Sequence, residues 1–129
     1  MRAYIGIKYH ADNSNRPRIE LISNALAACR YSTVCVIRDV EEWGAQQFDP
    51  ETLMQRTFLE IETCDVVIVD LTEKGVGVGI EAGYAHARGI PVVVIAEEGA
   101  DVSTTLQGIA AIVYHYQELS DLKAFFADF

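Results

Sequence analysis

The sequence predicts an α/β fold of the flavodoxin-like (Rossmann-like) type, a three-layer sandwich with a five-stranded parallel sheet in the order 2-1-3-4-5. Short β-branched segments of strand length alternate with segments of helical spacing, which indicates β-α-β units with right-handed crossovers. Residues 66–69 and 92–96 are apolar at nearly every position, as in strands buried on both faces. With 129 residues, half of them hydrophobic, we expect a single domain over residues 1–129.

The first half of the chain supplies two strands and a helix. Residues 2–8 alternate in the manner of a strand, and Pro17 suits the first turn of a helix. Apolar residues then follow helical spacing over 19–29, and the β-branched segment 33–37 predicts the second strand. Residues 39–49 are expected to form a loop.

The second half continues the alternation. Asp49 is a typical N-cap residue and is followed by Pro50, which suits the first position of a helix, so a helix is expected to begin there. A helix from about Gly79 to Arg88 follows the strand at 66–69, and Gly89 is a natural residue to end it. The remaining predicted elements are a short helical turn at 103–107, a fifth strand at 109–114 and a terminal helix at 120–128.

Topology predicts where a ligand binds. In open parallel sheets, ligands lie beyond the carboxyl ends of the strands, at the switch point between strands 1 and 3. The loops at 8–16 and 71–79 meet there, with the loop at 97–105 beside them.

Composition excludes several classes of function. A net charge of −9 argues against nucleic acid as a partner, and no apolar run is long enough to span a bilayer. The N-terminus resembles a strand and lacks a signal-peptide pattern, and the three cysteines show no CxxC spacing. The histidines show no metal-ligand spacing. We therefore expect a cytoplasmic protein with free thiols and no metal.

The strongest local indication of a functional site is a glycine-rich turn followed in the sequence by a carboxylate. Gly75, Gly77 and Gly79 follow the buried strand at 66–69, and Glu81 is expected in the first turn of the next helix. There the helix dipole would keep the carboxylate ionised, while the glycines let a ligand approach the backbone. The alternative is a flexible strand–helix connection with a surface glutamate that complements the dipole.

This region resembles the nucleoside 2-deoxyribosyltransferase family and the related deoxynucleoside 5′-monophosphate N-glycosidases. The matching segments are 65–72 (DVVIVDLT), 77–85 (GVGIEAGYA) and 89–92 (GIPV), and the resemblance extends over about residues 65–115. In the family, the glutamate of the G-x-G-x-E-x-G pattern attacks the anomeric carbon and forms a glycosyl-enzyme ester. The resemblance implies this role for Glu81, with no cofactor.

The resemblance also implies an oligomer. In the nucleotide-hydrolysing branch, a serine after strand 4 reaches into the neighbouring subunit's site and contacts phosphate, and Ser103 occupies that position. A homodimer or higher even oligomer is therefore expected. The alternative role of Ser103 is a helix N-cap.

Several positions depart from the family pattern. Gly75 stands where the transferases have Asp and the hydrolases Ser, and Thr57 stands where the hydrolases carry an acid. Asp70, at the end of strand 3, is the candidate to replace that acid as proton donor. The expected substrate-binding residues are Gly6, Lys8, Tyr9, Arg16, Gly75, Gly77, Gly79 and Ser103.

The function expected from these features is cleavage or transfer at the N-glycosidic bond of a (deoxy)nucleoside or its 5′-monophosphate. An anionic group of the substrate would lie near Lys8 or Arg16, two bases of the loop after strand 1. Two alternatives remain: a non-catalytic nucleotide-sensing module, and a hydrolase of a larger ribosyl compound such as a dinucleotide.

Overall fold

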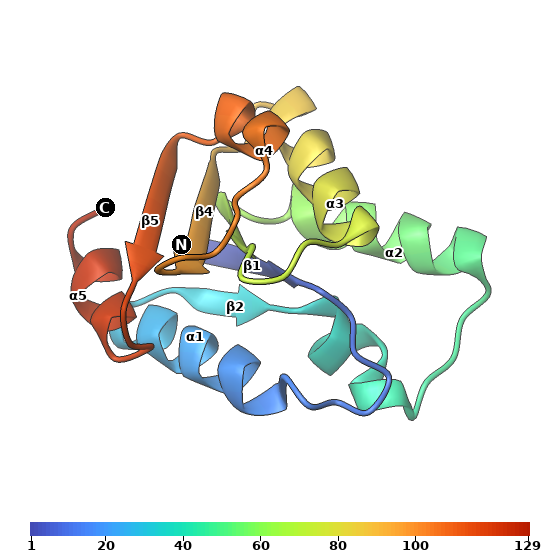
Figure 1. Ribbon diagram of the computed structural model, residues 1–129. Coiled ribbons are helices and arrows are strands. Elements are labelled where there is room, and N and C mark those ends of the chain that lie inside the picture. The colour runs from blue at the N-terminus through green and yellow to red at the C-terminus, as the bar shows by residue number, and fades with distance from the viewer.

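Five parallel strands form one sheet in the order β2-β1-β3-β4-β5, as the sequence predicts (Figure 1). The computed structural model describes all residues from 1 to 129. The strands are β1 (Arg2–Ile7), β2 (Ser32–Val34), β3 (Val66–Asp70), β4 (Val92–Glu97) and β5 (Ile112–Tyr116). The central strands β1, β3 and β4 are almost wholly buried, which explains their apolar character.

Helices cover both faces of this sheet (Figure 1). They are α1 (Arg16–Ala28), α2 (Pro50–Glu62), α3 (Val76–Ala87), α4 (Thr104–Ile109) and α5 (Asp121–Ala127). Helices α1 and α5 pack on one face, whereas α2, α3 and α4 pack on the other. None of these helices has the length and apolar character that crossing a membrane requires.

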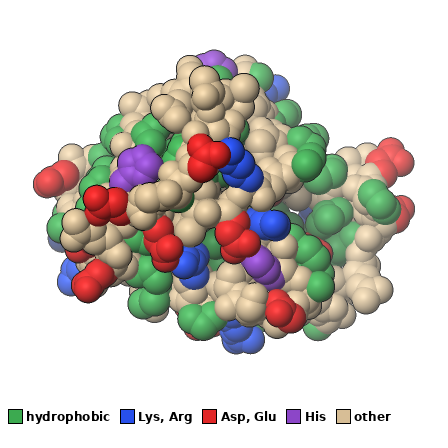
Figure 2. All heavy atoms as spheres, viewed as in Figure 1, with side chains coloured by type: hydrophobic (Ala, Val, Ile, Leu, Met, Phe, Trp, Pro, Cys, Tyr) green, Lys and Arg blue, Asp and Glu red, His purple; other side chains and the backbone are tan.

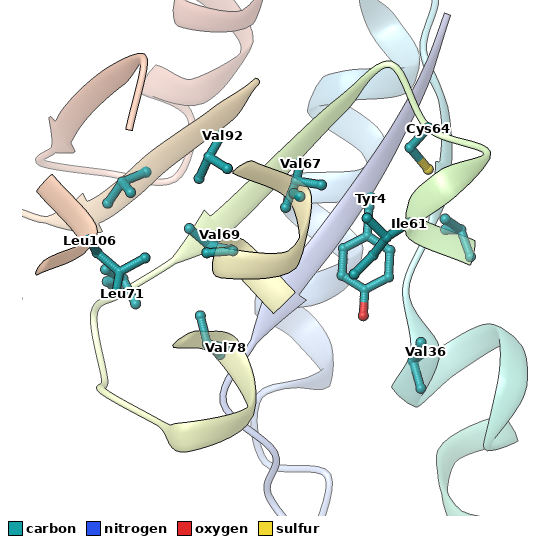
Figure 3. Packing of buried hydrophobic residues seen from close by; sticks show 14 of the residues in the cluster. Tyr4, Val36, Ile61, Cys64, Val67, Val69, Leu71, Val78, Val92 and Leu106 are labelled. Atoms are coloured by element: carbon teal, nitrogen blue, oxygen red, sulfur yellow. The ribbon is translucent and has the colours of Figure 1, made fainter. Parts of the chain in front are cut away.

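Strand alternation divides the core into two layers. Tyr4 pairs with Val67 and packs in the layer under α2 and α3, which Figure 3 shows. Ile5 pairs with Ile68 and packs in the layer under α1 and α5. The parity of a residue along a strand therefore decides which layer its side chain enters.

Two predicted helix ends are confirmed. The Asp49 carboxylate accepts a hydrogen bond from the backbone N–H of Thr52 at 2.8 Å, with Pro50 at the first helical position of α2. At the end of α3, Gly89 has a φ of +74°, a left-handed conformation that glycine adopts without steric cost.

The second strand is shorter than predicted. It ends at Val34, and Val36–Val40 form a π-helical turn (η1) instead of continuing the strand. The Asp39 carboxylate accepts the backbone N–H of Cys35 at 2.9 Å, and Arg38 donates to the carbonyl of Thr33. These side-chain bonds to the backbone make the chain curl where its β-branched composition favours a strand.

Helix α3 begins earlier than predicted, and this changes the setting of Glu81. The helix starts at Val76, with Gly75 extended before it, because the glycines at 77 and 79 are absorbed into the helix. Glu81 therefore lies in the second turn, and its expected place in the first turn is wrong. Strand β5 is also displaced, since α4 continues to Ile109.

Candidate active site

A pocket of about 590 Å³ opens at the carboxyl end of β1, between the segments that follow β1 and β2 and the start of α3. This is the edge of the sheet where the topology predicts a ligand. The lining is mainly apolar with a few polar groups, as in many small-molecule sites. Its lining includes two glycines, Gly75 and Gly77. The residues of the lining with a hydroxyl, carboxyl or amino group are Tyr4, Lys8, Tyr9, Glu41, Thr57 and Glu81.

Glu81 and Tyr4 form the polar centre of the pocket. The Tyr4 hydroxyl donates a hydrogen bond to Oε1 of Glu81 at 2.9 Å. Figure 3 shows the Tyr4 ring within the core layer, with its hydroxyl directed toward the end of the sheet where Val36 and Val78 lie. The second carboxylate oxygen, Oε2 of Glu81, has no hydrogen-bond partner in the protein. One oxygen is therefore held by Tyr4, while the other is buried beside β1 without a hydrogen-bond partner.

Gly6 explains how the carboxylate can lie so close to the sheet. A Cβ atom at this position would lie 2.8 Å from Oε2 of Glu81 and 3.0 Å from Cγ1 of Val69. Any side chain at Gly6 would push the carboxylate out of its place. Gly6 itself does not line the pocket, so the structure gives it a steric role beside Glu81, and its contact with substrate stays a prediction.

Burial controls the ionisation of Glu81. Desolvation raises its pKa from 4.5 to about 7, although the hydrogen bond from Tyr4 opposes this shift. The expectation that a helix N-terminus keeps this carboxylate ionised is wrong, because Glu81 lies beyond the first turn, where the dipole acts. The pKa of Tyr4 is raised well above 10, first by burial and then by Glu81, so its hydroxyl remains a donor.

Asp70 does not join this pocket. It points into the other layer, where it accepts hydrogen bonds from the Tyr116 hydroxyl and the Thr72 backbone N–H, each at 2.8 Å. The guanidinium of Arg18 lies 3.7 Å away. The prediction that Asp70 donates a proton beside Glu81 is therefore contradicted. Asp70 instead stabilises the loop that leads from β3 to α3.

The structure brings together some of the predicted substrate-binding residues and not others. Four of the predicted residues line the pocket: Lys8, Tyr9, Gly75 and Gly77. Lys8 has no carboxylate partner within the protein, so its ammonium group is available to a ligand.

Four predicted substrate-binding residues, Gly6 among them, lie outside the pocket. Arg16 lies over the ring of Trp43, 4.5 Å from its centroid, and forms an ion pair with Glu20, so its contact with substrate stays a prediction. Gly79 is also absent from the lining. The hydroxyl of Ser103 lies 2.7 Å from that of Thr105, without capping α4, and its contact with a partner subunit stays a prediction.

Besides Tyr4 and Cys35, sequence reasoning missed one carboxyl group of the pocket, that of Glu41. Glu41 directly follows η1 and lines the pocket together with Cys35, Val36 and Ile37. The available signal was its position in a loop that follows a strand, since such loops gather at the carboxyl edge of the sheet. Thr57 also lines the pocket, but its hydroxyl donates to the carbonyl of Leu53 at 2.8 Å.

No group of three or more His, Cys, Asp or Glu side chains is arranged to hold a metal ion. Acidic and basic side chains are interspersed over the face that Figure 2 shows.

Comparison with known proteins gives the fold. No family model and no curated protein matches the chain. Among solved structures, the CMP N-glycosidase BcmB of Clostridium botulinum has a TM-score of 0.72 at 17% identity, with 100% of both chains covered. A conserved protein from Enterococcus faecalis V583 has a TM-score of 0.78 at 13% identity, covering 99% of this chain and 98% of that one.

The 2-deoxyribosyltransferase of Bacillus psychrosaccharolyticus has a TM-score of 0.71 at 11% identity, with 98% of this chain and 96% of the other covered. The chain therefore has the α/β fold of the nucleoside 2-deoxyribosyltransferase-like structures over its whole length.

The raised pKa of Glu81 makes stability depend on pH. Between pH 4.5 and about 7 the folded chain binds a proton that the unfolded chain releases, so the free energy of unfolding falls as pH rises through this window. At pH 8.5 we expect Glu81→Gln to be more stable than wild type by about 2 kcal/mol, after allowance for partial exposure of the side chain. At pH 5 the difference should be small.

Urea unfolding at both pH values measures this effect. Glu98→Gln, a change at an exposed position without a side-chain partner, is the matched control and should alter stability little at either pH. Equal effects of Glu81→Gln at both pH values would contradict the raised pKa.

Proposed function

We propose that the protein is an enzyme that cleaves the N-glycosidic bond of a nucleoside or nucleotide, or transfers its sugar, through a covalent intermediate on Glu81. The observation that carries this proposal is the buried Glu81 carboxylate at an apolar pocket, with one oxygen held by Tyr4 and the other without a hydrogen-bond partner. The fold shared with a CMP N-glycosidase and a 2-deoxyribosyltransferase supports the same class of reaction.

The chemistry follows from the arrangement of the carboxylate. A carboxylate oxygen of Glu81 attacks the anomeric carbon while the bond from that carbon to the nucleobase breaks. The electron pair of the broken bond leaves with the base, which takes up a proton. Water or an acceptor base then attacks the anomeric carbon of the ester and regenerates the Glu81 carboxylate. A carboxylate suits both steps because their transition states resemble an oxocarbenium ion.

Burial gives the Glu81 carboxyl group a pKa that suits a nucleophile at neutral pH. A pKa of about 7 leaves a substantial fraction of Glu81 ionised at neutral pH. A poorly solvated carboxylate loses little hydration when it attacks, and the hydrogen bond from Tyr4 fixes the direction of attack. Replacement of Glu81 should therefore remove the reaction while leaving the pocket in place.

Lys8 gives the substrate an anion-binding contact. It is the only cationic side chain among the residues that line the pocket, and it has no carboxylate partner. Gly77, in the first turn of the 12-residue helix α3, lines the same pocket, so backbone N–H groups at the positive end of the helix support an anion there. We infer that the substrate is a 5′-monophosphate whose phosphate lies beside Lys8.

The expected assembly and location complete the proposal. We infer a cytoplasmic homodimer or higher even oligomer in which Ser103 reaches the phosphate bound to the neighbouring subunit. The side chain of Ser103 lies away from its own pocket, which is compatible with a contact made to another copy.

Release of free base from a panel of nucleosides and 5′-monophosphates tests the proposed reaction. We expect wild type to release base, and Glu81→Gln to lower kcat by at least about 1000-fold, because the covalent route is lost. Chromatography of the reaction mixtures measures the released base, and Glu98→Gln is the control with unchanged activity.

Two results would contradict this function. Near-normal base release by Glu81→Gln would exclude the nucleophile. Binding of nucleotides by calorimetry, without base release by wild type, would favour the nucleotide-sensing module.

The phosphate contact predicts a selective effect of Lys8→Ala. We expect this change to lower kcat/KM for a 5′-monophosphate by about 10-fold, which corresponds to about 1.4 kcal/mol, and to leave the parent nucleoside nearly unaffected. Lys74→Ala is the matched control, since Lys74 is an exposed lysine that pairs with Asp101 outside the pocket. If Lys8→Ala weakens both substrates equally, the phosphate does not lie beside Lys8.

A further inference from the structure

The pocket contains two carboxyl groups, and they come from different parts of the chain. Glu81 belongs to α3, whereas Glu41 directly follows η1, the turn that replaces the end of the predicted second strand. These two are the only acidic residues among those that line the pocket. Reactions at a glycosidic bond commonly use two carboxyl groups with different roles.

Hydrogen bonds hold Glu41 at the wall of the pocket. Its backbone N–H donates to the carbonyl of Val36 at 2.9 Å, and its own carbonyl accepts from the N–H groups of Gly44 and Gln46 at 2.9 and 3.0 Å. The turn before it is stabilised by Asp39, which caps the backbone N–H of Cys35. The position of Glu41 is thus set by bonds on both sides.

The side chain of Glu41 has no partner in the protein. It makes no hydrogen bond or ion pair, whereas the carboxylates of Glu20, Glu60 and Glu97 are each paired with an arginine. Burial raises the pKa of Glu41, which keeps it protonated to higher pH than an exposed glutamate. A carboxyl group that is partly buried and unpaired in a pocket is suited to exchange a proton with a ligand.

We propose that Glu41 is the proton donor to the leaving nucleobase, an inference that rests on the proposed function. As the bond from the anomeric carbon to the base breaks, its electron pair goes to the base, and the Glu41 carboxyl transfers its proton to a ring nitrogen or exocyclic oxygen of that base. Glu41 then takes a proton from the water that hydrolyses the Glu81 ester. Both carboxyl groups return to their starting states.

Neither of the positions considered from the sequence, Asp70 and Thr57, supplies a proton donor beside Glu81. Asp70 faces the opposite core layer, and Thr57 has no acidic proton and uses its hydroxyl within α2. Glu41 supplies the missing acid from a different segment of the chain.

A comparison of leaving groups tests the role of Glu41. A nucleobase needs a proton to depart, whereas 4-nitrophenolate is stable as an anion and needs none. We expect Glu41→Gln to lower kcat/KM by about 100-fold or more on the nucleotide that wild type cleaves. On the 4-nitrophenyl β-glycoside of the same sugar, the decrease should be less than about threefold.

The neighbouring residue provides a matched control. Glu42→Gln alters an exposed carboxylate outside the pocket and should leave both activities unchanged. Glu41→Asp, which keeps a carboxyl group, should recover part of the nucleotide activity, and thermal unfolding checks that each variant is folded.

The outcomes separate this inference from the proposed function. If Glu41→Gln lowers both activities equally, or neither, Glu41 is not the proton donor, although the function of Glu81 can still hold. If wild type cleaves neither substrate, the proposed function fails and this inference fails with it.

Discussion

The close approach of the Glu81 carboxylate to the backbone of β1 organises the whole site. It requires the absence of a side chain at Gly6, because a Cβ atom there would come within 2.8 Å of Oε2. It also requires the Tyr4 hydroxyl to occupy the other carboxylate oxygen. Both residues project from the same face of one strand, so a two-residue spacing in β1 sets the position and the ionisation of a group on α3.

Two acidic side chains near this edge of the sheet differ in their surroundings. Asp70 and Glu81 are both carboxylates near the carboxyl edge of the sheet, yet they lie in different layers. Asp70 accepts two hydrogen bonds, and the guanidinium of Arg18 lies 3.7 Å away, so its carboxyl group is fully engaged by the protein. Glu81 has only the Tyr4 hydroxyl, and burial without further partners raises its pKa toward neutrality. The same type of side chain is therefore fully engaged in one layer and has an unpartnered oxygen in the other, and the proposed reaction uses the second of these.

The sequence predicted the strand order and the pocket's place, because buried β-branched runs and helical spacing are strong signals in a parallel sheet. Glu81 was predicted from the glycine-rich turn before it and from the family resemblance, and Lys8 from its place in the loop after the first strand; both residues line the pocket. The predictions from the sequence failed where a side chain bonds to the backbone or contacts a residue distant in the sequence. The turn at Cys35 depends on Asp39, and the place of Arg16 depends on Trp43, a residue distant in sequence. Glu41 was missed because that turn, which directs it into the pocket, is not visible in the pattern of residues.

The most direct test of a nucleophilic Glu81 is the capture of a sugar ester on this residue. A 2-deoxy-2-fluoro analogue of the substrate is suitable, because fluorine at C2 destabilises the oxocarbenium-like transition states and slows hydrolysis of the ester. Mass spectrometry of the digested protein should find the fluorinated sugar on the peptide that contains Glu81, and no adduct should form in Glu81→Gln. An adduct on another residue, or turnover of the natural substrate without any adduct, would contradict a covalent mechanism through Glu81.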